Sequence, residues 1–160
     1  MTRVLPLALL LSACGLQPMY AGGGSGAVAN ALAGVEVAPI EGKAGWLVSN
    51  ALRDRLQLSG APRYRLQVRL DDQIAGLGVR RDDSVTRERR TLRARYQLLD
   101  TATGTVVLDA TAGSDAGVDV VGSEYATIAA EATALERLSG IVADQIVARV
   151  ALFARRTATP

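Results

Sequence analysis

The 160-residue sequence predicts an α/β (α+β) domain, a two-layer sandwich of a four-stranded mixed sheet with two helices packed on one face, in the order β-α-β-β-β-α. Two observations predict it. Apolar and polar residues alternate strictly over 64–70 and 92–98, which is typical of half-buried strands. Apolar residues recur at three- and four-residue spacing over 44–58 and 123–155, which is typical of amphipathic helices.

The first strand is predicted over 35–40 and the first helix over Ala44–Leu58. The helix has an apolar stripe formed by Val48, Leu52 and Leu56. Ser59-Gly60 is predicted to end it, with the glycine as a left-handed cap. Because a helix separates the first two strands, we expect them to be parallel, with a right-handed crossover.

The remaining strands are predicted to be joined by hairpins. A strand is expected over 64–70, continuing irregularly to 79, and a turn over 80–84 leads to a strand over 85–98. A loop over 100–104 leads to a strand that begins at 106 and ends or bulges within 113–122. A helix over 123–155 completes the chain's predicted elements. Ser123 is the expected N-cap of the last helix. Both helices are expected to cover the same sheet face, which leaves the other face uncovered.

The N-terminal segment has the features of a bacterial lipoprotein signal. Arg3 precedes a short apolar run, which ends in Leu11-Ser12-Ala13-Cys14. The run is far shorter than the roughly 20 apolar residues that span a bilayer. We therefore expect residues 1–13 to be removed and Cys14 to carry a diacylglycerol and an N-acyl chain such as palmitate. The alternative is a buried N-terminal element with an ordinary core cysteine.

This interpretation divides the chain into four parts. Residues 1–13 are the signal peptide, 14–32 a lipidated N-terminus and flexible glycine-rich tether, 33–156 a single domain, and 157–160 a tail. Gly15, in place of an aspartate, favours the outer membrane, with the domain on the periplasmic side.

Composition argues against an enzyme and against a metal or other cofactor beyond the attached lipid. The chain has no histidine, a single cysteine that the lipid would occupy, and Lys43 as its only lysine. The adjacent acids Asp71-Asp72 and Asp82-Asp83 are expected to point away from each other at strand ends. The glycine-rich segment 21–26 lacks the lysine of a phosphate-binding loop.

The middle of the chain is basic, and arginine dominates it. Strand alternation places the candidate binding residues on the uncovered sheet face: Arg65, Arg69, Arg89, Arg93 and Arg95. Guanidinium groups bind phosphate and carboxylate groups through paired hydrogen bonds, which suits an anionic partner. The alternative is a solvated face whose charges prevent edge-to-edge aggregation. Nucleic acid is a poor candidate because few aromatic residues are available to stack on bases.

The chain resembles the LptE family of lipopolysaccharide-assembly lipoproteins over nearly all of residues 10–156. Cys14-Gly15-Leu16-Gln17-Pro18-Met19-Tyr20 is similar to the start of the mature family members, with Met19 in place of the commoner leucine. Residues 45–52 resemble the first helix of the family, and 89–98 its third strand. Ala130-Glu131 and the stretch 141–149 fit its last helix.

The resemblance implies a role that composition does not show. Family members sit as a plug inside the LptD β-barrel of the outer membrane, help the barrel to assemble and bind lipopolysaccharide. Basic residues make the glycolipid contact in the family, but the resemblance does not assign them to individual positions of this sequence. The alternative is a periplasmic auxiliary lipoprotein, a binding module of an ABC-type lipid transporter.

Overall fold

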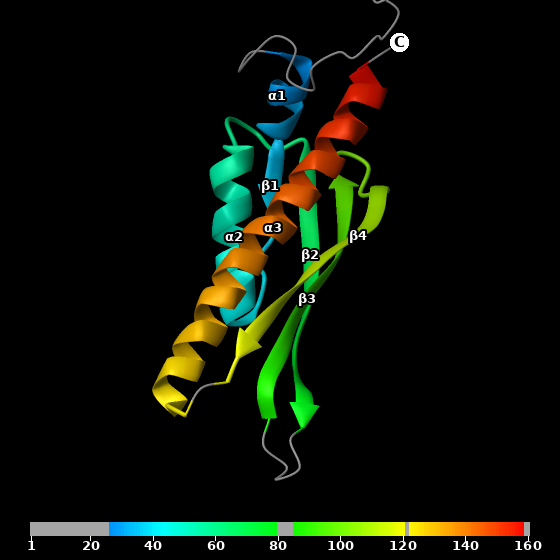
Figure 1. Ribbon diagram of the computed structural model, residues 1–160. Coiled ribbons are helices and arrows are strands. Elements are labelled where there is room, and N and C mark those ends of the chain that lie inside the picture. Colours follow the sequence, from blue (N-terminus) through cyan, green and yellow to red (C-terminus); the bar gives the residue numbers. More distant parts are fainter. Residues whose placement is uncertain (1–25, 80–84, 121, 159–160) are drawn as a thin grey trace, which may run out of the picture.

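A computed structural model describes residues 26–79, 85–120 and 122–158. Figure 1 shows a twisted sheet with helices on one side of it. The elements are α1 (Ala27–Leu32), β1 (Val35–Val37), α2 (Gly42–Leu56), β2 (Tyr64–Val79), β3 (Val85–Asp100), β4 (Val106–Asp119) and α3 (Glu124–Ala158).

The four-stranded sheet has the order β1-β2-β3-β4. β1 is parallel to β2, and the other neighbours are antiparallel. α2 and α3 pack on one face and leave the opposite face open (Figure 1). The predicted fold class and the uncovered face are therefore confirmed.

The core lies between the sheet and these two helices, and it is almost entirely aliphatic. The fully buried side chains include Leu52 of α2, Leu66 and Leu98 of the sheet, and Leu138 and Ile146 of α3. Tyr96 is buried at the centre of β3, where burial raises the pKa of its hydroxyl. The inward side chains of β2 and β3 are those that alternation predicts.

Two features differ from the prediction. Helix α1 occupies part of the segment assigned to the tether, because Leu32 is buried in the core and α1 packs against α3. α2 ends at Leu56 rather than Leu58, and Gln57 takes the left-handed cap conformation at φ 49°. Gly60 also has a positive φ, but it lies beyond the helix end.

Strand β4 ends at Asp119, within the range 113–122 that the sequence predicts for its end. Its register with β3 runs on to Arg87 opposite Asp119, and the irregularity lies at Leu98/Leu99, near the other end of the strand. Two glycines in this segment sit beneath arginine side chains of β3. A Cβ at Gly113 would lie 2.6 Å from Cδ of Arg93, so the glycine makes room for that side chain.

Candidate functional site: the open sheet face

The open face is formed by the side chains of β1–β4 that point away from α2 and α3. Its charged members are six arginines and five carboxylates: Arg65, Arg69, Arg87, Arg89, Arg93 and Arg95, with Glu36, Asp71, Asp109, Asp115 and Asp119. The face therefore carries a net charge close to zero, unlike the arginine-dominated surface that the sequence suggested.

Carboxylates of β4 pair with three of the four outward arginines of β3. Arg95 lies 3.1 Å from Asp109, and Arg87 lies 3.3 Å from Asp119. Asp115 accepts a 2.7 Å hydrogen bond from Thr91 and lies 3.4 Å from Arg93. These pairs are solvent-exposed, so each contributes little to stability. They instead fix where the guanidinium groups lie.

Hydrogen bonds hold two of these carboxylates in the ionised form. The pKa of Asp109 is lowered first by the hydrogen bond from Arg95 and next by the one from Gln97. The pKa of Asp115 is lowered chiefly by the hydrogen bond from Thr91, with a smaller effect of the Arg93 charge. Near neutral pH both carboxylates compete with any incoming anion for the arginines.

Within the described ranges, Arg69 of β2 has no such partner, and neither does Arg89 of β3. Arg69 is exposed, and among the described residues it makes no ion pair or hydrogen bond. Its cross-strand neighbour is Arg95, a like charge. Asp71, the next outward residue on β2, instead accepts hydrogen bonds from Gln73 at 3.0 and 3.2 Å. The uncompensated charge on this part of the face is therefore concentrated at Arg69.

A shallow hollow of about 530 Å³ lies beside Arg69. Its rim carries Arg69, Arg93, Arg95 and Asp71, and Thr111 lies on the β4 side. Three arginines border this one concavity, and arginine suits a phosphate group because its guanidinium donates paired hydrogen bonds. The hollow is thus the part of the open face best suited to an anionic ligand.

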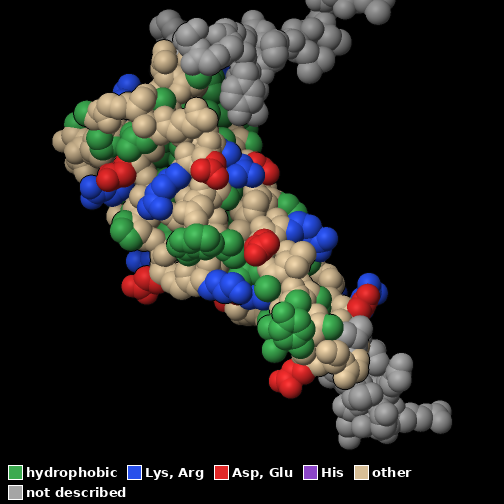
Figure 2. All heavy atoms as spheres, turned by 90° about the vertical axis from the view of Figure 1, so that its left-hand side faces the viewer, with side chains coloured by type: hydrophobic (Ala, Val, Ile, Leu, Met, Phe, Trp, Pro, Cys, Tyr) green, Lys and Arg blue, Asp and Glu red, His purple; other side chains and the backbone are tan. Residues whose placement is uncertain are grey.

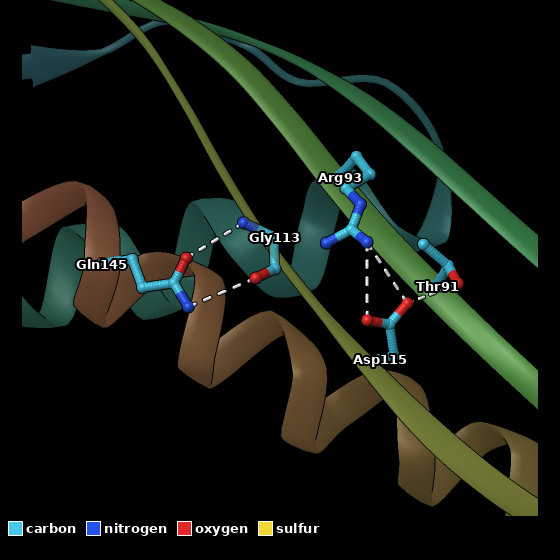
Figure 3. A network of polar contacts seen from close by, with 5 residues as sticks. All are labelled: Thr91, Arg93, Gly113, Asp115 and Gln145. Carbon is cyan, nitrogen blue, oxygen red and sulfur yellow. Dashed lines mark hydrogen bonds and ion pairs between the residues drawn. The ribbon is translucent and has the colours of Figure 1, made fainter.

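The β4 side of this region is held from behind by α3. In Figure 3, Gln145 of α3 pairs its side-chain amide with the backbone of Gly113. The Gly113 N–H donates to Oε1 at 2.9 Å, and Nε2 donates to the Gly113 carbonyl at 3.3 Å. Gln145 thus takes the place of a neighbouring strand at the sheet edge next to the Arg93–Asp115 pair (Figure 3).

The adjacent acids Asp71 and Asp72 point to opposite sides of the sheet, as predicted, but they lie inside β2 rather than at a strand end. Asp72 faces the helix layer, where Arg90 binds it through Nε at 2.9 Å and Nη2 at 2.6 Å. Arg90 also donates to the carbonyl of Glu131 in α3 at 3.0 Å. This arginine therefore ties β2, β3 and α3 together and is unavailable to a ligand. The acids Asp82-Asp83 lie outside the described residues.

The structure brings together only three of the five predicted arginines. Arg69, Arg93 and Arg95 border the hollow. Arg65 instead forms an ion pair with Glu36 of β1, with 3.1 Å between Nε and Oε2. Arg89 lies farther along β3, opposite Ala75 and Gly117. The sequence alone did not place the β4 carboxylates beside these arginines, because their proximity depends on the register between β3 and β4. Their spacing at odd positions, 109, 115 and 119, was the available signal.

The helix layer offers no comparable arrangement. In Figure 2, which looks at the α2 side, positive and negative side chains are interspersed, with separate hydrophobic groups between them. Large exposed apolar side chains include Trp46 and Tyr125. Within the described ranges no helix combines the length and apolar character needed to cross a membrane, and no cluster of potential metal ligands occurs. Cys14 lies outside those ranges.

The model of the LptE family, described as lipopolysaccharide-assembly, matches residues 32–150. The chain belongs to the LptE family. The match covers every strand of the sheet, α2 and most of α3. No curated protein matches the sequence.

Solved structures show that this LptE-family chain shares its fold with other bacterial proteins. A Caulobacter crescentus CB15 structure has a TM-score of 0.67 at 22% identity and covers 80% of this chain and 96% of its own. The rare lipoprotein B from Shewanella oneidensis has a TM-score of 0.62 at 10% identity, and the alignment covers 77% of this chain and 96% of that protein. A minor lipoprotein from Acinetobacter baumannii has a TM-score of 0.60 at 16% identity, and the alignment covers 74% of this chain and 90% of that protein.

Proposed function

We propose that this LptE-family chain is an outer-membrane lipoprotein that plugs an LptD-like β-barrel, helps the barrel to assemble and takes part in lipopolysaccharide delivery to the cell surface. The observation that carries the proposal is the family match over residues 32–150, which spans the whole sheet. The open face supports it, since a mosaic of arginines and carboxylates suits the polar interior of a large barrel.

A lipid on Cys14 would attach the domain to the periplasmic side of the membrane. The support is the signal-like segment that precedes this cysteine. Two or more acyl chains give stable attachment, whereas one chain binds only marginally. Helix α1 is docked on α3. The length of chain available as a tether would then be residues 14–26, shorter than the sequence alone suggested.

Lipopolysaccharide contact is proposed at the hollow bordered by Arg69, Arg93 and Arg95. The near-zero net charge of the open face makes a diffuse electrostatic attraction weak, so binding must depend on local geometry. Arg69 offers a guanidinium with no competing carboxylate, and the other two retain donors besides those facing Asp109 and Asp115. Arg65 and Arg89 lie outside this hollow and would contact the barrel or solvent.

The first test is lipopolysaccharide binding by charge-reversed variants. We expect Arg93→Glu with Arg95→Glu to weaken binding at least tenfold, and Arg69→Glu alone to weaken it measurably, because each removes phosphate donors. Binding would be measured by fluorescence titration of purified protein. The matched control is Arg53→Glu with Arg137→Glu, which makes the same charge change on exposed positions of α2 and α3.

Equal weakening in the control and in the hollow variants would mean that only net charge matters. Unchanged lipopolysaccharide binding in the hollow variants would mean that these arginines face solvent or the barrel and do not contact lipopolysaccharide. Circular dichroism of each variant shows whether the fold is intact, because these side chains are exposed and outside the core. The alternative function, an auxiliary module of an ABC-type transporter, predicts a different membrane partner.

A further inference from the structure

The outer edge of β2 is paired with another strand for only a short length. β1 pairs with Tyr64, Arg65 and Leu66, and the last hydrogen bond on this side is donated by the N–H of Ala38 to the carbonyl of Leu66. β2 then continues to Val79. Among the described residues no backbone group hydrogen-bonds to this edge beyond Leu66. In Figure 1 the lower half of β2 runs along the outside of the sheet.

The register shows which backbone groups are free. The N–H of Tyr64 and the carbonyl of Leu66 both point toward β1. Since the direction of the backbone groups alternates along a strand, Val68, Leu70, Asp72, Ile74 and Gly76 direct their N–H and C=O groups to the unpaired edge. The odd-numbered residues between them direct theirs to β3. The free edge is thus a continuous template for one more strand.

The opposite edge of the sheet is treated differently. There the backbone of Gly113 is occupied by the side-chain amide of Gln145, and α3 packs along β4. In the described part of the chain no element pairs with β2 beyond Leu66, and the lower half of β2 lies apart from α3 in Figure 1. Among these residues, one edge of the sheet is thus protected and the other is left accessible.

Side chains along the free edge indicate what would bind there. Ile74, on the helix side of the sheet, is 44% exposed, although it lies in the middle of a long strand. Arg69, on the open face, has no acidic partner among the described residues. At the start of the edge a hollow of about 500 Å³ is lined by Pro39, Ile40 and the segment 67–70. An added strand with an apolar residue beside Ile74 and an acid beside Arg69 would complement this edge.

Building on the proposed function, we propose that an extended segment of the β-barrel partner adds to the sheet as a fifth strand along Val68–Gly76 of β2, with an acidic side chain facing Arg69. Main-chain hydrogen bonds would supply the affinity, and Arg69 and Ile74 would supply the register. The mode of docking is thus strand addition, beyond the contact of a polar face with a polar lumen.

A second copy of this chain fits the same edge poorly. In an antiparallel pair of two β2 strands, Arg69 faces Asp71 of the other copy only if the pair is centred on Leu70. In that register each copy's β1, which pairs with residues 64–66 on the same edge, would lie opposite residues 74–76 of the other copy and leave only a few residues free to pair. Registers centred farther along, at Asp72, place the Asp72 carboxylates of the two copies opposite each other. Charge complementarity therefore favours a different polypeptide.

Residue-resolved amide hydrogen exchange by mass spectrometry tests the inference, on the isolated chain and on the complex extracted with its barrel. We expect the amides of Leu70, Asp72 and Ile74 to exchange at least tenfold more slowly in the complex. The amides of Asp71 and Gln73 face β3 and serve as internal controls, since they are protected in both samples. An alternating pattern of this kind is specific to strand addition.

Ile74→Pro removes one edge donor while leaving the β2–β3 hydrogen bonds in place, and Ile74→Val is its matched control. With an unchanged thermal midpoint of the isolated domain, the proline variant is expected to dissociate from the barrel at least tenfold faster. Equal exchange of the edge amides in the free and the bound chain overturns the inference. Protection of these amides that appears as the concentration of the isolated chain rises also overturns it, because the edge would then pair with a second copy. Failure to recover any barrel overturns the proposed function itself, and strand addition to the barrel with it.

Discussion

At the scale of single residues, the open face depends on pairing between neighbouring strands. Alternation along β2 and β3 correctly predicts which arginines point outward, because strand periodicity is a local property. It does not predict that Asp109, Asp115 and Asp119 lie beside them, because that depends on the register of β4. A face rich in one charge in the sequence thus becomes nearly neutral in the fold.

The depressed pKa of Asp115 gives a residue-scale prediction. A carboxyl whose pKa is lower in the folded than in the unfolded state stabilises the fold above its unfolded pKa of about 3.9, and this stabilisation is lost as pH falls through the folded pKa. We expect the free energy of unfolding of Asp115→Asn to fall less steeply below pH 4 than that of the wild type. Urea unfolding between pH 2.5 and 6 measures it. Parallel curves for both proteins would contradict the assignment.

At the scale of elements, α2 can start where it does because Gly45 has no side chain. A Cβ at this position would lie 2.6 Å from the carbonyl oxygen of Ile40, so the first turn packs directly on the segment that follows β1. The sequence predicts this helix from its apolar stripe. It does not reveal the close contact, since a glycine within a helix by itself only lowers helix propensity.

We therefore expect Gly45→Ala to destabilise the domain by about 1–3 kcal/mol, although alanine favours a helix by about 1 kcal/mol over glycine. The neighbouring atom is backbone and cannot move cheaply. Gly117→Ala is the control, because its Cβ would meet only the flexible Arg87 side chain, at 3.4 Å. Thermal unfolding of both variants, compared with the wild type, measures the change in stability. A Gly45→Ala variant as stable as the wild type would show that the contact relaxes freely.

The Arg90–Asp72 pair is the second prediction at this scale. Its side chains are 12% and 24% exposed, and Arg90 also binds the Glu131 carbonyl of α3. Arg90→Lys loses the bidentate geometry, and we expect it to reduce the free energy of unfolding by about 1–2 kcal/mol. Arg87→Lys, which alters an exposed pair, is expected to change it by less than about 0.5 kcal/mol. Chemical denaturation measures the free energy of unfolding of both variants. Equal losses in the two variants would contradict the conclusion that Arg90 links α3 to β2 and β3.

Two segments form regular structure although local propensity alone does not favour it. Helix α1 is too short to be stable alone and forms through packing of Leu32. The C-terminal half of β4 is rich in glycine and aspartate, which have low strand propensity, and its pairing with β3 overrides that preference. Tertiary contacts decide both cases, and neither is visible in a local window of sequence.

At the scale of the whole molecule, two helices cover one face of the sheet and leave a polar face and one strand edge accessible. That arrangement, the match to the LptE family and the lipoprotein-like N-terminus together support a domain held at the membrane and docked in a β-barrel.

The most direct measurement is extraction of the full-length chain from its own membranes in mild detergent, followed by affinity purification and identification of stoichiometric partners. A Cys14→Ala variant serves as the control for membrane attachment. The result that we predict is one outer-membrane β-barrel protein recovered in equal amount with the chain. Recovery of an inner-membrane ATPase complex and no barrel would contradict it.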